Sequence, residues 1–267
     1  MSNRKGGLEQ PTAEILSIGN ELLIGHTLDT NSNWIAKHLN RIGWQLQRVT
    51  QVRDSLDAIS NGILESLRRK PKVLITLGGL GPTHDDMTMA GIARALNRPL
   101  RVNREALRLI KDHYGKLDSR PSLTKYRTKM ASLPQGAEPV LNPVGTAPGV
   151  KIQSSKTTIF SLPGVPSEMK EIFQGSILPF LKLSGHVRHT EMEIKIAGII
   201  ESALAPVLDL ARRKYAGLYF KSHPRGRETG IRPLILLHIY NVRPDSARDV
   251  EAAAREILQQ LSKIGRK

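Results

Sequence analysis

The sequence predicts an α/β protein with a three-layer main domain, built on a mostly parallel sheet, and a small α+β domain. Over residues 13–184, apolar runs of strand length alternate with patterns of helical period. This alternation favours parallel strands with helices on both faces. After residue 184 the order becomes strand, helix, strand, strand, helix, which suits a small α+β domain. We therefore expect a flexible tail at 1–12, the main domain at 13–184 and the small domain at 185–267.

The elements of the main domain follow from the spacing of its apolar residues. Short apolar or alternating runs predict strands, and recurrence every three or four residues predicts helices. In chain order, the expected elements are a strand at Ala13–Ile18, a helix from Thr30 or Asn31 to Gly43, a strand at Trp44–Val52, a helix from Asp54 or Ser55 to Leu67, a strand at Val73–Leu77, a helix at Thr88–Leu96, an interrupted helical segment at Arg101–Met130, a hairpin of Lys151–Gln153 and Thr157–Leu162, and a helix from Ser167 or Glu168 to Phe180. The polar residues at the helix starts are expected as caps, and Gly43 as a stop.

The small domain is predicted in the same way. Its expected elements are strands at Thr190–Ala197, Gly217–Lys221 and Leu234–Tyr240, helices at Ile200–Tyr215 and Asp245–Ile264, and a hairpin loop at His223–Gly230.

The composition limits the classes of function. The chain has no cysteine, which excludes disulfides, thiolate zinc sites and cysteine nucleophiles. No apolar run approaches the ~20 residues that cross a bilayer, and the basic start lacks a secretion signal, so we expect a cytoplasmic protein without a membrane partner. The net charge of +16 favours anionic partners, and residues 94–129 hold eleven Lys or Arg against three acidic residues. Because only 4% of residues are aromatic, there are few rings on which bases could stack, and this argues against a nucleic-acid partner.

A glycine turn follows the strand at Val73–Leu77. Glycines at 78, 79 and 81, with Leu80 between them, precede a helix start. Without Cβ atoms, the backbone N–H groups of such a turn can approach a phosphate closely. The alternative is that the turn is only a tight connection. Thr83, His84 and Thr88 continue the segment as further candidates for phosphate contact, and His84 could instead be simply solvated.

Adjacent carboxylates, Asp85 and Asp86, come directly after this turn. Carboxylate oxygens are ligands for divalent cations, so the pair is expected to hold a metal ion against phosphate oxygens. Either residue could instead cap the helix that follows.

Two further acidic residues are expected on the same rim of the sheet. Asp54 ends the second strand and Glu21 lies in the loop after the first, and the carboxyl ends of parallel strands share one edge. Asp54 is therefore a third candidate metal ligand, and Glu21 a candidate catalytic residue. Asn20 and Asn31 lie in the same loop and could bind substrate, although helix capping competes for Asn31.

Two segments rich in proline and glycine could wall a ligand cleft. They are Asn142–Gly149 and Leu162–Glu168, and turn chemistry alone would also explain them. The candidate binding residues within them are Gly145, Thr146, Pro163, Gly164 and Glu168.

Taken together, these motifs closely resemble the amino-terminal domain of CinA proteins. The matching stretches are Gly19–Gly25, Asp29–Asn31, Gly78–Asp86, Asn142–Gly149 and Leu162–Glu168, with Gly198 and Glu201-Ser202 in the small domain. The resemblance implies a molybdopterin-binding-type domain with a MogA-like fold, and metal-dependent hydrolysis of ADP-ribose and related dinucleotides. Asp86 and Asp54 match the two aspartates of the MogA pattern.

The sequence departs from these families at two positions. Leu80 replaces the threonine of the molybdopterin enzymes, which favours the CinA branch, and His84 replaces a lysine that is common in CinA sequences. No match to the carboxy-terminal nicotinamide-mononucleotide deamidase domain of full CinA proteins is found in this chain, so deamidase activity is not expected.

The expected function is hydrolysis of ADP-ribose to AMP and ribose 5-phosphate with Mg, Mn or Co, with or without a monovalent cation. The alternative is a molybdopterin-binding protein that holds a pterin phosphate without turnover. A third possibility is that the charge excess and the small domain bind RNA. The resemblance also implies a homo-oligomer.

Overall fold

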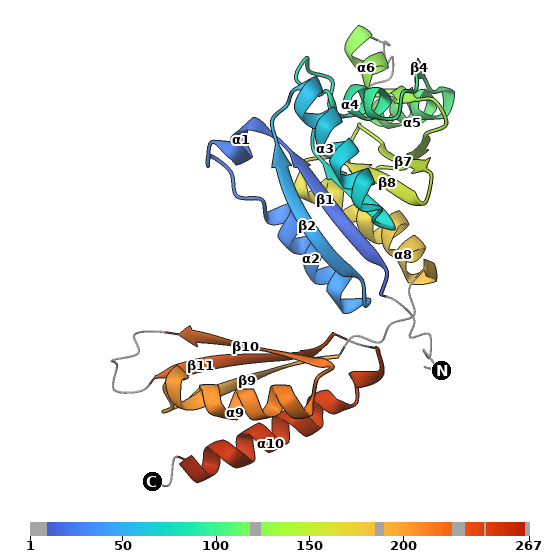
Figure 1. Ribbon diagram of the computed structural model, residues 1–267. Helices are drawn as coiled ribbons and strands as arrows, with labels where there is room; N and C mark the ends of the chain where they lie inside the picture. The colour runs from blue at the N-terminus through green and yellow to red at the C-terminus, as the bar shows by residue number, and fades with distance from the viewer. Residues whose placement is uncertain (1–9, 118–123, 185–189, 226–232, 243, 265–267) are drawn as a thin grey trace, which may run out of the picture. The chain divides into compact units, whose positions relative to one another are not determined.

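The computed structural model describes residues 10–117, 124–184, 190–225, 233–242 and 244–264 (Figure 1). The chain divides into two compact units, one formed mainly by 11–185 and the other mainly by 186–267. Each unit has its own hydrophobic core. Within the described ranges, no helix is both long and apolar enough to cross a membrane.

The larger unit is built on a six-stranded mixed sheet in the order β2-β1-β3-β8-β7-β6. The strands are β1 (Thr12–Ile18), β2 (Gln45–Val52), β3 (Val73–Leu77), β6 (Glu138–Val140), β7 (Gly149–Ser154) and β8 (Thr157–Leu162). Pairings among β2, β1, β3 and β8 are parallel, whereas β7 and β6 pair antiparallel. Two short strands, β4 (Leu100–Val102) and β5 (Ser132–Pro134), form a separate antiparallel pair.

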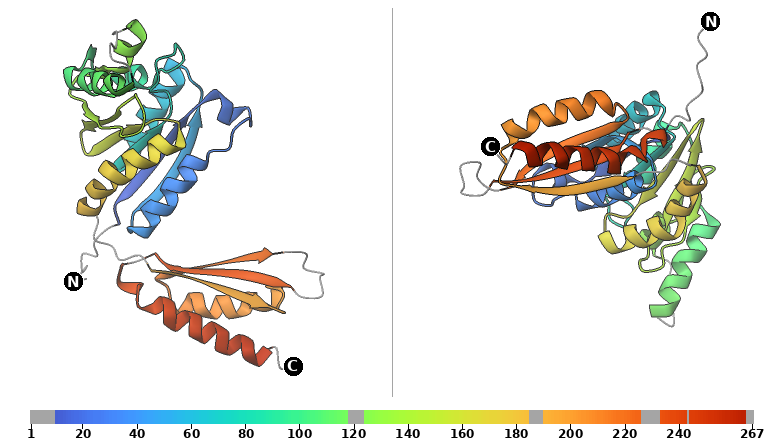
Figure 2. Two further views of the ribbon diagram at one scale, coloured as in Figure 1. Left: turned by 180° about the vertical axis from the view of Figure 1, so that it is seen from behind. Right: turned by 90° about the horizontal axis from the view of Figure 1, so that it is seen from below.

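Helices cover both faces of this sheet, so the predicted α/β class is confirmed (Figure 2). On one side, Leu16, Leu74 and Ile159 of the sheet share a core with apolar residues of four helices. These are α3 (Leu56–Arg69), α4 (Thr88–Ala95), α5 (Arg104–Leu117) and α6 (Lys125–Met130). The opposite side carries α2 (Thr30–Arg41), α7 (Pro166–Ile172), a π-helical turn (Phe173–Ile177) and α8 (Leu178–Ser184). A short helix, α1 (Asn20–Leu23), follows β1.

The helix caps differ in part from the predicted ones. Ser55 caps α3 by accepting a hydrogen bond from the N–H of Ala58. At α2 the cap is Asp29 and not Thr30 or Asn31, because the Asp29 carboxylate accepts from the N–H of Ser32 at 2.9 Å. The helix α4 begins at Thr88 without a side-chain cap. The prediction that Asp85 or Asp86 caps this helix is therefore wrong, and both carboxylates have other partners.

The smaller unit is a three-stranded antiparallel sheet with two helices, as predicted for a small α+β domain. In chain order its elements are β9 (Glu191–Ala197), α9 (Glu201–Lys214), β10 (Leu218–Arg225), β11 (Leu234–Asn241), a 3-10 turn (Pro244–Ser246) and α10 (Asp249–Ile264). The strand order is β10-β11-β9. The strand β10 extends to Arg225, beyond its predicted end, because it pairs with β11 along its whole length. Most of the predicted loop at 223–230 lies outside the described residues.

An ion pair between the buried carboxylate of Glu14 and the partly exposed Arg69 joins β1 to α3 in the larger unit. Glu14 is 1% exposed, and its two carboxylate oxygens accept from Nε and Nη2 of Arg69 at 2.7 Å each. Removing one partner of such a pair leaves a buried charge without compensation. We expect Arg69→Met to lower the free energy of unfolding by about 3 kcal/mol, measured by urea denaturation. The matched control is Arg68→Met at the neighbouring exposed position, and equal losses in both variants would contradict the prediction.

Candidate functional site

A cleft lies at the carboxyl ends of the four parallel strands. Gly19 follows β1, Asp54 follows β2 after one residue, Gly78 follows β3 and Pro163 follows β8. In open parallel sheets this rim is where ligands bind, because loops from neighbouring strands diverge there. The cleft has a volume of about 620 Å³, which is within the range of sites for small organic ligands.

The cleft is lined by acidic side chains although the protein is strongly basic. Six of the lining residues carry a carboxylate: Glu21, Asp29, Asp54, Asp85, Asp86 and Glu168. Among the described residues that line it, none is Lys, Arg or His. An anion bound in this cleft would therefore meet no basic side chain from the described lining.

The glycine turn is held in a conformation that only glycine adopts without strain. Gly78 has φ 96° and Gly79 has φ 66°. The N–H of Gly78 donates to Leu162 at 2.9 Å, and Thr88 donates through Oγ to the carbonyl of Gly78 at 2.8 Å. The N–H groups of residues 79–81 donate to no other residue in the described part of the chain. They are therefore available to a ligand, as a phosphate site requires.

Thr83 holds the two adjacent aspartates. Asp86 accepts from the N–H of Thr83 at 2.8 Å and from its hydroxyl at 2.5 Å, and Asp85 accepts from the same hydroxyl at 2.5 Å. A hydroxyl has one proton and cannot donate it fully to two carboxylates. Lys129 of α6 donates through Nζ to the carbonyl of Thr83. The hydrogen bond from Thr83 lowers the pKa of Asp85, with a smaller contribution from Lys129.

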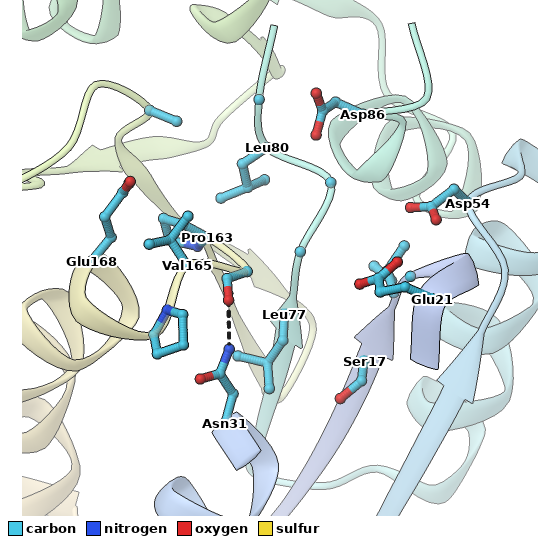
Figure 3. A pocket seen from close by; sticks show the side chains of 18 of the residues that line it. Ser17, Glu21, Asn31, Asp54, Leu77, Leu80, Asp86, Pro163, Val165 and Glu168 are labelled. Carbon is cyan, nitrogen blue, oxygen red and sulfur yellow. Dashed lines mark hydrogen bonds between the residues drawn. The ribbon is translucent and has the colours of Figure 1, made fainter. Parts of the chain in front are cut away.

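Asp54 lies close to the other carboxylates of this wall. It accepts from the N–H of Asn20 at 2.7 Å. Burial raises the pKa of Asp54, and the negative charges of Glu21, Asp85 and Asp86 raise it further. Figure 3 shows Asp86, Asp54 and Glu21 on one side of the glycine turn. Their mutual repulsion is a cost that a bound cation would relieve.

Asp54→Asn is expected to raise the melting temperature at neutral pH. Because the pKa of Asp54 is raised in the folded state, its ionisation destabilises the fold as the pH rises through that raised pKa. Asparagine has no proton to lose and can still accept from Asn20. The gain should be present at pH 7 and vanish below the ordinary aspartate pKa of 3.8, as thermal denaturation at both pH values can show. Asp57→Asn, at an exposed position of α3, is the control, and a similar gain there would argue against this explanation.

The opposite wall of the cleft comes from the two proline- and glycine-rich segments. Asn31 donates through Nδ2 to the carbonyl of Gly164 at 2.7 Å (Figure 3). Asn142 donates to Glu168 at 2.6 Å. A Cβ atom on Gly145 would lie 2.1 Å from the Glu168 carboxylate, so a larger residue here would displace that carboxylate. These contacts join the two segments, which the sequence alone left as either cleft walls or ordinary turns.

Most predicted site residues lie in the cleft lining. They are Glu21, Asn31, Asp54, Gly78, Gly79, Leu80, Gly81, Asp85, Asp86, Thr146, Pro163, Gly164 and Glu168. The others lie next to it. Asn20 contacts Asp54, Thr83 contacts the aspartate pair, and Gly145 lies against Glu168. Thr88 is buried behind the turn, and the side chain of His84 is 97% exposed, with its Nδ1 4.0 Å from Asp85.

Sequence reasoning missed a partly buried hydrogen-bond network in the cleft lining. Asp29 accepts from the hydroxyls of Ser17 and Ser32 at 2.7 and 2.6 Å. Burial raises its pKa, but these hydrogen bonds outweigh burial and lower the pKa overall. Asp29 is a polar residue two positions before Asn31. This closeness in sequence could have indicated that Asp29 also belongs to the site. Ser17, near the carboxyl end of β1, also lines the cleft, as do Tyr114 of α5 and Met130 of α6. No local pattern indicates this.

The carboxylates do not form a ready-made metal site. Within the described residues, no group of three or more His, Asp or Glu side chains is arranged to hold a metal ion. The donor set nevertheless fits a hard divalent cation, because it consists of carboxylate oxygens that repel one another. Thr83 engages one oxygen of each aspartate, Oδ1 of Asp85 and Oδ2 of Asp86, so the second oxygen of each could bind a cation while these hydrogen bonds remain.

Comparisons with known proteins identify the family. Residues 14–183 match the family described as a probable molybdopterin binding domain. A protein of Aeropyrum pernix is 41% identical over 97% of this chain and 94% of its own length, and one of Sulfurisphaera tokodaii is 38% identical over 95% and 94%. The crystal structure of CinA from Thermoplasma acidophilum, described as a protein of unknown function, is 38% identical, covers 62% of this chain and 95% of its own, and has a TM-score of 0.58. The chain therefore belongs to the family of the probable molybdopterin binding domain.

Proposed function

We propose that this protein is a CinA-type pyrophosphatase that uses a divalent cation to hydrolyse ADP-ribose, or a related dinucleotide, to AMP and a sugar phosphate. One observation carries the proposal: free N–H groups of the glycine turn and four carboxylates, Glu21, Asp54, Asp85 and Asp86, line one cleft. The motifs shared with CinA proteins and the volume of the cleft support it.

The charge of the cleft favours a ligand that brings its own cation. Two like charges 4 Å apart repel by about 4 kcal/mol near a protein surface, so a bare pyrophosphate would be repelled by the aspartates. None of the described basic residues at 94–129 lines the cleft, and Lys129 makes only a small contribution to lowering the pKa of Asp85. We infer that the substrate is a complex of a dinucleotide with Mg, Mn or Co, with or without a monovalent cation.

The roles of the residues follow from their positions. The N–H groups of Gly79, Leu80 and Gly81 would bind phosphoryl oxygens and stabilise the charge that develops there. Asp54, Asp85 and Asp86 would hold the cation, which supplies Lewis-acid stabilisation of the phosphate oxygens when bound.

The hydrolysis step itself would involve Glu21 and one water molecule. Glu21 would accept a hydrogen bond from that water, and this contact orients it toward one phosphorus atom. The water oxygen bonds to this phosphorus, the bridging P–O bond breaks, and the protons of the water are shared between the two phosphate products.

The opposite wall suits the remainder of a dinucleotide. Asn31, Thr146 and Glu168 present amide, hydroxyl and carboxylate groups there, and these can pair with sugar hydroxyls or with the amino group of a base. The same groups could bind the polar edge of a pterin. The second candidate function is therefore binding of molybdopterin without turnover, which the description of the matched family favours.

The test uses the purified full chain and ADP-ribose, with Mg, Mn or Co supplied separately. We expect AMP and ribose 5-phosphate in equal amounts, detected by chromatography, with activity lost in EDTA and restored by added metal. Absence of AMP with all three metals, together with tight retention of a pterin phosphate, would instead establish the second candidate. A protein that does neither would contradict both.

A further inference from the structure

The sheet of the smaller unit has one face that the helices of that unit do not cover. Both α9 and α10 lie on the same side of the sheet (Figure 1), where they share a core with Ile196, Phe220 and Leu237. Because side chains alternate along a strand, the residues between these positions point to the other face. That open face is formed by Glu191, Glu193, Lys195 and Ala197 of β9, Tyr219, Lys221, His223 and Arg225 of β10, and Leu234, Leu236, His238 and Tyr240 of β11.

Three rings lie side by side at one end of this open face. Tyr219 is the cross-strand partner of Tyr240, and their ring centroids are 5.1 Å apart with an angle of 33° between the planes. The ring of His238 follows at 5.2 Å from that of Tyr240. Tyr219 is 44% exposed. Aromatic residues are scarce in this protein, so two tyrosines beside an imidazole on an open face form an unusual platform.

Lysine and arginine side chains, with one further histidine, continue from this platform along the open face. Lys221 is the cross-strand partner of His238, and His223 and Arg225 follow it along β10. Lys195 lies on the other side of the central strand, opposite Leu236. Two carboxylates, Glu191 and Glu193, stand at the ring end, where Glu191 contacts His238 at 3.2 Å. The face therefore combines rings at one end with positive charge toward the other.

We propose that this open face binds single-stranded nucleic acid. Bases stack on aromatic side chains whatever their sequence, and neighbouring Lys and Arg bind the phosphates. The cross-strand tyrosine pair alone could be explained by sheet stability. That explanation does not account for the three lysine and arginine side chains that continue along the same face. The sequence argued against a nucleic-acid partner on the count of aromatic residues, but the fold brings two of them together.

The test measures binding of fluorescein-labelled 12-nucleotide oligo-U and oligo-dT to the full chain by fluorescence anisotropy. We expect the double variant Tyr219→Leu and Tyr240→Leu to raise Kd about tenfold or more. The matched control, Tyr219→Phe with Tyr240→Phe, keeps both rings and should stay within about twofold. A preference for oligo-U over oligo-dT would identify RNA, and the reverse would identify DNA.

A second pair of variants tests the charges without touching the rings. Lys221→Gln with Arg225→Gln should make the negative slope of log K against log salt less steep by roughly 1.4, since each phosphate contact contributes about −0.7 for a single strand. The control, Arg255→Gln with Lys263→Gln, removes two cations from α10 and should leave the slope unchanged. These variants keep the proposal testable if the leucine variant does not fold.

Three outcomes would overturn the proposal. One is absence of oligonucleotide binding by the wild-type chain, and another is equal binding by the leucine and phenylalanine variants. The third is a wild-type dimer that the leucine variant converts to a monomer with unchanged oligonucleotide binding, because the face would then pair with a second copy. None of these results depends on the hydrolysis of ADP-ribose, so this proposal and the proposed function can fail separately.

Discussion

Replacing Asp86 with Asn is expected to lower kcat for ADP-ribose hydrolysis by about 10³-fold, the loss typical of one electrostatic group that acts on the transition state. The amide oxygen of Asn can still accept from the N–H of Thr83, so the loop after the glycine turn should keep its shape. What is lost is the negative charge that would hold the cation. Steady-state kinetics with Mg, Mn and Co would measure the effect.

The control for this variant is Asp112→Asn. Asp112 pairs with Arg108 on an exposed face of α5, and surface ion pairs of this kind contribute little to stability. It should keep wild-type kcat. A variant Asp86→Asn that melts early but retains its kcat would show that Asp86 serves only to hold the loop. Retained activity with a raised requirement for metal would instead assign the main metal contacts to Asp54 and Asp85.

Gly78→Ala is expected to lower the free energy of unfolding by about 3–4 kcal/mol. A non-glycine residue in the left-handed region costs about 1–2 kcal/mol, and Gly78 has φ 96°. In addition, the new Cβ would lie 2.4 Å from the carbonyl oxygen of Ile18. That oxygen belongs to the backbone at the end of β1 and cannot move aside as a flexible side chain could. The melting temperature of the larger unit should fall by roughly 10 °C.

A second glycine provides a control in which the same substitution should raise the free energy of unfolding. Gly115 lies in α5, and a Cβ there would meet no atom within 4 Å. Alanine is the better helix former, so Gly115→Ala should stabilise the protein by about 0.5–1 kcal/mol. Both variants add one methyl group, and thermal and urea denaturation would compare them directly. If both destabilise the protein to a similar extent, the special geometry of the glycine turn is not the cause.

The distribution of charge bears on both proposals. The chain has a net charge of +16, yet the described lining of the cleft contains six carboxylates and no basic side chain. A basic protein attracts nucleotides over long distances, whereas the acidic lining of the cleft favours nucleotides that are in complex with a metal cation. The charge excess therefore need not act at the cleft, and part of it lies on the open face of the smaller unit.

Local sequence determined the chemistry of the glycine turn and most of the elements. It did not predict α1, β5 and β6, and the helical prediction for Arg101–Met130 was wrong at its start, where β4 lies. The strands Val73–Leu77 and Thr157–Leu162 were predicted with the bounds that the structure has, because both are short runs rich in β-branched residues and bounded by turn residues. The cap at Ser55 and the stop after α2 also followed from local chemistry. The cap at Asp29 did not, because several polar residues in succession compete for one position and only the path of the chain selects among them.

Only the tertiary structure decided which distant residues share a site. Asn31 and Gly164 are 133 positions apart but form a hydrogen bond, because α2 and the loop after β8 meet where parallel strands end. Tyr219 and Tyr240 pair through the register of two antiparallel strands, which the alternation of residues alone does not specify, because a shift by two residues keeps every side chain on the same face. The periodicity of apolar residues indicates the type of each element and which of its faces is buried. The contacts between elements arise from packing, so the partners across the cleft and across the small sheet could not be identified from the sequence alone.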